Sequence, residues 1–143
     1  MTTAEQLTQI FRDNFVAYFR SHVAHVNITG RNFTADHELL GGIYESLQGQ
    51  IDIIGELLRT LREFMPCDIQ EVLDESHIDT GELSGSADHY LEMVMEDLDH
   101  LIEEYRELID IAEAEEHQEI ANYAQDRVLA IEKQTWMLRS TLE

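Results

Sequence analysis

Four side chains in the first half of the sequence have the types and the spacing to bind a transition-metal ion together. His25 and His37 lie twelve residues apart, on either side of a short polar segment that contains Gly30 and is typical of a turn. Asp52 and Glu56 follow at the i,i+4 spacing that sets two carboxylates on one face of a helix. Imidazole and carboxylate groups together suit iron. His25, His37, Asp52 and Glu56 are therefore the candidate metal-binding and catalytic residues.

The histidine pair requires two antiparallel helices joined by the turn. A Thr-x-x-Gln capping box at residues 3–6, followed by apolar residues at spacings of three and four, predicts a first helix that ends near Asn27. Residues 33–61 carry an apolar stripe with a period of 3.5, which predicts a second helix. If these helices pack antiparallel, His25 and His37 lie at the same height and can share a metal ion.

The second half of the sequence predicts two further long helices. A short helix is expected at residues 68–74, followed by a polar stretch that contains two glycines. Buried helical faces are then expected over residues 91–112 and 120–138. We therefore expect an all-α fold, a single domain over residues 1–143. Its architecture is a four-helix bundle with a short extra helix in the connection between the second and third long helices.

The composition excludes several classes of protein. The chain has 143 residues, with 9 Lys and Arg against 30 Asp and Glu, so its formal net charge is −21. Such a chain offers no basic face for nucleic acid. The single cysteine, Cys67, cannot form an intramolecular disulfide, and no apolar run approaches the length of a membrane span. We expect a soluble cytoplasmic protein with no membrane partner.

The distance along the second helix decides how the four candidate ligands can meet. His37 and Asp52 are fifteen residues apart, which is roughly 22 Å at 1.5 Å per residue. One subunit therefore cannot complete the site. A two-fold axis across this helix would bring the histidine end of one chain beside the carboxylate end of the other, giving two identical sites per dimer.

A structural interpretation of the same residues stays open. His37 falls on the apolar stripe, where a lone histidine is more often a satisfied core residue, and two exposed carboxylates are more often a solvated face. The joint geometry favours the metal site. His22 could be a further ligand, although a role in the core or in an interface is the simpler interpretation. The remaining histidines are expected at the surface: His77, His89, His100 and His117.

The segment HVNITGRNFTADHELLGGIYESLQGQIDIIGELL resembles the Dps family, the DNA-binding proteins from starved cells, which are miniature ferritins with a ferritin-like fold. The family pattern has a histidine, a glycine five residues later, Asn-Phe, a His-Glu pair, a tyrosine and an acidic pair spaced by four. The matching residues here are His25, Gly30, Asn32, Phe33, His37, Glu38, Tyr44, Asp52 and Glu56.

This resemblance implies an iron-oxidising and iron-storing protein. Members form hollow homo-oligomeric shells of twelve subunits, a dodecamer. They oxidise Fe(II) at dimer-interface sites with hydrogen peroxide or dioxygen and store the ferric mineral inside. The resemblance assigns the iron ligands His25 and His37 to one subunit and Asp52 and Glu56 to its two-fold mate. This ferroxidase activity, an oxidoreductase reaction, would protect DNA and other targets against oxidative stress.

Two departures from the family pattern leave alternatives open. Where the family usually has an acidic residue four positions after the second histidine, this chain has Gly41, so a water or Glu45 would have to substitute. A shell with an impaired ferroxidase site and no enzymatic role is the alternative. The N-terminal segment has no basic tail, so direct DNA binding is disfavoured, and a structural DNA-protecting protein is a further alternative. Acidic residues at 113–119 could line an iron channel or form a solvated turn.

Overall fold

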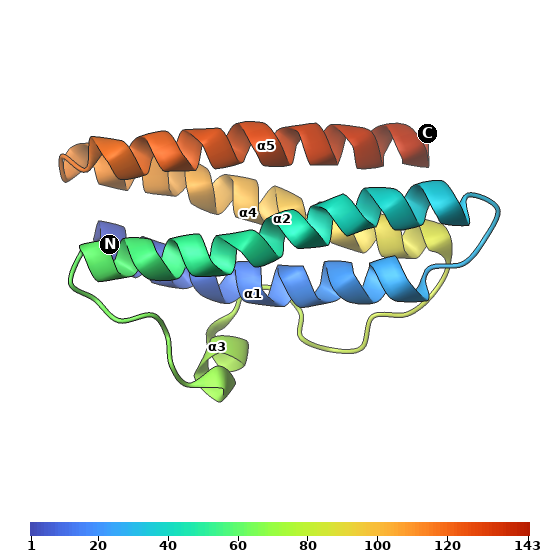
Figure 1. The fold of residues 1–143 in the computed structure, drawn as a ribbon, viewed down its shortest axis with the longest axis horizontal. Coiled ribbons are helices and arrows are strands. Elements are labelled where there is room, and N and C mark those ends of the chain that lie inside the picture. The colour runs from blue at the N-terminus through green and yellow to red at the C-terminus, as the bar shows by residue number, and fades with distance from the viewer.

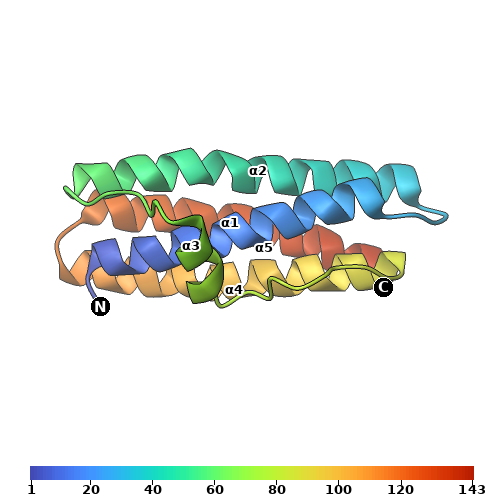
Figure 2. The ribbon, with the colours of Figure 1, turned by 90° about the horizontal axis from the view of Figure 1, so that it is seen from below.

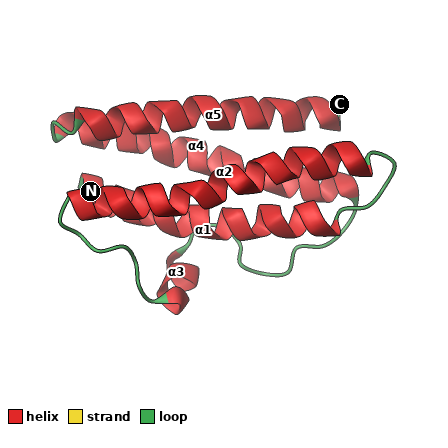
Figure 3. Cartoon of the chain, viewed as in Figure 1, coloured by secondary structure: helices red, strands yellow, loops and turns green.

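The computed structural model describes residues 1–143 as five helices without a strand (Figures 1 and 3). This confirms the all-α prediction and the short extra helix. No helix is both long enough and apolar enough to pass through a membrane. The helices are α1 (Thr3–Asn27), α2 (Phe33–Thr60), α3 (Ile69–Glu75), α4 (Ala87–Ala114) and α5 (Gln118–Leu142).

The four long helices form two antiparallel hairpins, α1 with α2 and α4 with α5, and the hairpins meet mainly through α1 and α4. Because α2 and α4 run in the same direction, residues 61–86 must return along the length of the bundle (Figure 2). Helix α3 lies within this connection and packs on α1. The predicted crossover bundle is therefore the observed architecture.

The apolar stripe of α2 faces the core, where Leu40, Leu47, Ile54 and Leu58 are fully buried. The prediction for α1 is only partly correct. The side chain of Phe19 on α1 is 61% exposed, although the apolar pattern would bury it. Several polar side chains of α1 are buried instead, and some of them form hydrogen bonds with residues of other helices. The polar residues of α1 that are buried are Thr3, Gln6, Asp13, Asn14, Arg20 and Ser21.

The start of α1 differs from the prediction by one residue. The capping box is formed by Thr2 and Glu5, and not by Thr3 and Gln6. The sequence offers both registers, and tertiary contacts decide between them. The backbone N–H and the hydroxyl of Thr3 donate to Glu115 Oε1, at 2.6 and 2.5 Å, and these bonds lower the pKa of Glu115. Glu115 therefore joins the start of α1 to the turn between α4 and α5, where its charge complements the helix dipole.

A buried ion pair joins the two hairpins. Arg20 Nε on α1 donates to Asp97 Oδ2 on α4 at 2.7 Å, and the two side chains are only 7% and 10% exposed. Burial raises the pKa of Asp97 to about 6, although Arg20 acts in the opposite direction. The carboxylate therefore depends on Arg20 to stay charged in this environment.

The substitution Asp97→Asn is expected to lower the free energy of unfolding by about 3–5 kcal/mol, because Arg20 cannot lose its proton and would be left buried without a counter-ion. The double replacement Arg20→Met with Asp97→Leu should lose clearly less, since it removes both charges. Urea unfolding of variants with the same oligomeric mass measures both values. Equal stability of Asp97→Asn and the parent chain would show that this pair does not hold the hairpins together.

Candidate metal centre

His25 and His37 lie face to face where α1 turns into α2. Their ring centroids are 3.8 Å apart and their planes differ by 15°. His25 Nδ1 lies 2.6 Å from the backbone oxygen of His37, and His37 Nδ1 lies 2.7 Å from the backbone oxygen of His25. A carbonyl oxygen can only accept, so in both rings Nδ1 carries a proton, and in the neutral ring Nε2 then has the lone pair. The pair therefore offers two imidazole lone pairs with a fixed tautomer, as metal-binding histidines require.

Aromatic side chains hold the two imidazole rings in place. Phe33 stacks on His37 with a centroid distance of 5.1 Å, and the ring of Tyr44 lies 5.0 Å from that of His25. His22 is half-buried, stacks on Tyr44 at 4.0 Å and lies 3.0 Å from the hydroxyl of Tyr18 through its Nδ1. The contacts of His22 match the interpretation of a packing residue that supports the pair.

Gly41 lies directly against this pair. A Cβ atom added at position 41 would stand 3.1 Å from Cε1 and 3.3 Å from Nδ1 of His25. Such contacts are tighter than a side chain tolerates without movement, and His25 is held by its hydrogen bond and its stacking. The absent side chain therefore leaves room for the imidazole ring, in addition to removing a carboxylate that the family pattern would supply.

Asp52 and Glu56 are exposed on α2, and the single subunit does not bring them to the histidines. His37, Asp52 and Glu56 all belong to helix α2. His37 and Asp52 are therefore separated by roughly 22 Å along the helix axis, and Glu56 lies one turn further away. Glu45 is also exposed. Within one chain the histidine half of the predicted site is assembled and the carboxylate half stands apart.

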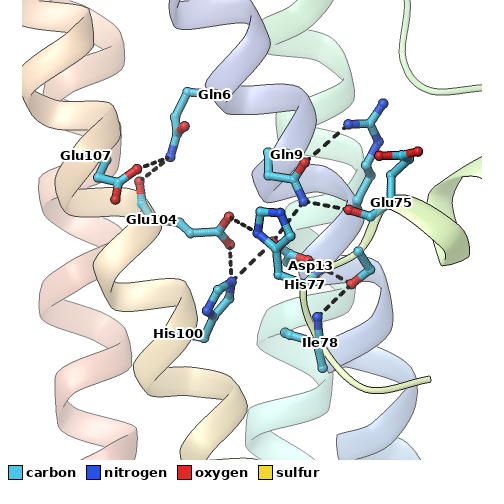
Figure 4. A network of polar contacts seen from close by, with 11 residues as sticks. Gln6, Gln9, Asp13, Glu75, His77, Ile78, His100, Glu104 and Glu107 are labelled. Carbon is cyan, nitrogen blue, oxygen red and sulfur yellow. Dashed lines mark hydrogen bonds and ion pairs between the residues drawn. The ribbon is translucent and has the colours of Figure 1, made fainter. Parts of the chain in front are cut away.

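The structure also gathers two histidines that the sequence placed simply at the surface. His77, in the connection after α3, and His100, on α4, approach Asp13 of α1 and Glu104 of α4 (Figure 4). Only the i,i+4 spacing of His100 and Glu104 could have signalled this group, because the other two members come from distant segments. His100 is partly exposed, at 33% of its side chain, as a surface position requires, but it also faces two buried carboxylates, which the sequence did not indicate.

The fold and the histidine pair define a class of protein. A family model described as a ferritin-like domain matches residues 4–143, and the chain belongs to this family. Comparison with individual proteins of the family identifies a narrower group of relatives. The chain is 28% identical to the DNA protection during starvation protein of Helicobacter pylori, with 99% of each chain covered. It is 26% identical to the protein of the same name from Brevibacillus brevis, again with 99% of each covered.

Solved structures agree with these relatives. The crystal structure of a Dps protein from Bacillus brevis superposes with a TM-score of 0.93 at 26% identity, covering 99% of this chain and 95% of that one. The resemblance to the Dps family that the sequence predicted is therefore confirmed.

The substitution Gly41→Ala tests how closely the backbone of α2 is fitted to His25. In an open helix position alanine stabilises by up to about 1 kcal/mol relative to glycine, and Gly42 is such a position, with no atom within 4 Å of an added Cβ. We expect Gly42→Ala to raise the free energy of unfolding. Gly41→Ala should instead lower it by about 1–2 kcal/mol through overpacking against His25.

Chemical denaturation of the two variants gives this comparison, and the imidazole signals of His25 in an NMR spectrum report its displacement. If Gly41→Ala stabilises the protein as much as Gly42→Ala, His25 can move aside, and its close contact with position 41 does not affect the free energy of unfolding.

Proposed function

We propose that this chain is the subunit of an iron-oxidising and iron-storing shell, a dodecamer built from two-fold dimers. Fe(II) is its substrate. The observation that carries the proposal is the reciprocal hydrogen bonding of His25 and His37, which leaves the Nε2 lone pair of each ring available to a metal ion.

The second half of each iron site comes from a neighbouring subunit in this proposal. His37 and Asp52 are equidistant from a point near Tyr44 and Glu45 on α2, and a two-fold axis there would lay the α2 helices antiparallel. Each histidine pair would then meet Asp52 and Glu56 of the mate.

The proposed reaction oxidises two iron ions for each molecule of hydrogen peroxide. Two Fe(II) lose one electron each, hydrogen peroxide accepts both electrons, its O–O bond breaks, and two protons complete two molecules of water. The imidazoles of His25 and His37 hold iron without adding charge, whereas Asp52 and Glu56 supply negative charge that favours Fe(III) over Fe(II). Dioxygen is the alternative oxidant.

The charge of the chain supports a cationic substrate and disfavours direct binding to DNA. Each subunit carries a formal charge of −21, so an assembly would attract Fe(II) and repel the phosphate backbone. The relatives are named for DNA protection during starvation. For this chain we propose protection through removal of Fe(II) and peroxide, the reagents that generate hydroxyl radicals.

A second candidate function follows from Gly41. Without an acidic side chain at this position, the shell could assemble but oxidise iron no faster than buffer does. The rise of ferric absorbance after addition of Fe(II) separates the two functions: a fast, saturable rise supports the ferroxidase, and a rate equal to that of buffer supports the inert shell.

Mixing two inactive variants tests the shared iron site. His37→Ala and Asp52→Ala should each abolish fast oxidation when all subunits carry the change. In a mixed dimer, one site collects both defects and the other keeps every ligand. Random reassembly from equal amounts makes half of the dimers mixed, so about a quarter of the sites, and of the parental activity, should return.

A mixture of His25→Ala with His37→Ala is the matched control, because both defects then fall in the same half of the site and every mixed dimer has two damaged sites. Mass spectrometry verifies that the shells contain both chains. Activity that stays at the level of the separate variants in the first mixture would rule out the shared site.

Gel retardation of plasmid DNA at low ionic strength tests the electrostatic argument. We expect no shift at micromolar protein, because no basic segment is available to replace the counter-ions of the phosphates. A shift that disappears with added salt would contradict this and indicate direct DNA binding.

A further inference from the structure

Four ligand-forming side chains from three separate segments meet where α1, α4 and the connection after α3 come together. They are Asp13 of α1, His100 and Glu104 of α4, and His77 of the connection after α3, and their ligand atoms all lie within 4.8 Å of one another (Figure 4). Asp13 and His25 are twelve residues apart on α1, about 18 Å along the helix axis. The group is therefore independent of the proposed iron site.

The two carboxylates are buried, and one oxygen of Glu104 has no hydrogen-bond partner. The side chain of Asp13 is fully buried and that of Glu104 is 8% exposed. Glu104 Oε1 accepts no hydrogen bond, although His100 Nε2 lies 3.3 Å away. A buried carboxylate oxygen without a donor is unfavourable unless a cation or a proton compensates it. A cation bound close to Glu104 Oε1 would compensate the burial of this oxygen.

Both oxygens of Asp13 accept hydrogen bonds, and Oδ2, which accepts from Gln9 Nε2 at 3.2 Å, is also directed into the group. Its Oδ1 accepts hydrogen bonds from Ser76 Oγ at 2.7 Å and from the backbone N–H of His77 at 2.6 Å. Its Oδ2 faces His77 Nδ1 at 3.7 Å and His100 Nε2 at 3.4 Å, the latter a long hydrogen bond. Asp13 thus orients the connection and presents a carboxylate oxygen to both imidazoles.

The spacing of the ligand atoms suits a small transition-metal ion. The nitrogen to oxygen separations within the group are 3.3, 3.4, 3.7 and 3.8 Å. Ligand atoms at 2.0–2.2 Å from a tetrahedral zinc ion stand roughly 3.3–3.6 Å apart. The quoted separations involve both oxygens of Glu104, and one ligand atom from each residue lies within 4.8 Å of the others, so side-chain movements of about 1 Å would place four ligand atoms around one ion. Two imidazoles beside two carboxylates favour zinc or another late transition metal over calcium and magnesium, which prefer oxygen ligands.

We propose that Asp13, His77, His100 and Glu104 form a second metal site, specific for a zinc-type divalent cation, which fastens the crossover connection to α1 and α4. The two carboxylates neutralise the charge of the ion, and the two neutral imidazoles complete four-fold coordination. The side chain of His77 is 58% exposed, so the ion reaches the site directly from solvent and His77 is the ligand that closes it.

The shared environment affects the pKa values of the two carboxyl groups in opposite directions. Burial, together with the neighbouring Asp13, raises the pKa of Glu104 to about 10. Burial acts in the same direction on Asp13, but its hydrogen bonds with Glu104, Ser76 and the backbone of His77 hold its pKa below the usual value.

Zinc binding to metal-free shells tests the proposal in a His37→Ala background, which disables the proposed iron site so that the second site is counted alone. Isothermal titration with Zn²⁺ should give one site per chain, and the zinc-loaded shell should melt at a higher temperature than the metal-free one. Addition of His77→Ala should weaken Zn²⁺ binding at least about tenfold and remove the thermal shift. His77 lies in an exposed loop, so its replacement leaves the helical core intact.

His117→Ala is the matched control. His117 also lies beside a carboxylate, with its Nδ1 3.6 Å from Glu119 Oε1, but it is outside the group. This variant should keep the full zinc stoichiometry. Crystals soaked in Zn²⁺ should show an anomalous peak between Asp13, His77, His100 and Glu104. Equal zinc affinity in the His77 and His117 variants, or zinc peaks only at other positions, would overturn the proposal.

Discussion

Helices α2 and α4 are successive long helices of the bundle yet run in the same direction, and this constraint organises the molecule. The chain must return along the bundle before α4 can begin, which explains the long connection and the position of α3 over α1. It also leaves two local hairpins as the basic units of the fold. The turn of one hairpin positions His25 against His37, whereas the contact between the hairpins positions Arg20 against Asp97.

The two groups of ligands differ in how the fold builds them. His25 and His37 belong to neighbouring turns of one hairpin, and each holds the other through a backbone carbonyl. Asp13, His77 and His100 come from three segments that meet only when the crossover lies in place. The first group depends on local geometry and the second on the whole bundle. This difference explains why one was visible in the sequence and the other was not.

Periodicity was sufficient to predict the helices and their order, because burial of an apolar stripe dominates the stability of such a bundle. Equal distance from a turn was sufficient to predict that His25 and His37 meet. The capping register of α1 could not be predicted, since both candidate pairs have the right spacing and Glu115, far along the chain, decides between them. Arg20 is a buried polar residue that interrupts the apolar stripe of α1. It is tolerated in the core because it pairs with Asp97, seventy-seven residues away in the sequence.

The crossover has a consequence for the order of folding. The α1–α2 and α4–α5 hairpins join residues that are near in sequence, so their loop-closure entropy is small and they can form early. Contacts between them, such as Gln6 with the backbone of Glu104, close a loop of 98 residues and are expected to form last. Each nascent hairpin therefore exposes an apolar face until it finds the other. Where many identical chains fold at high concentration, hairpins of different chains compete for the same partner, so this topology favours domain swapping as its form of misassembly.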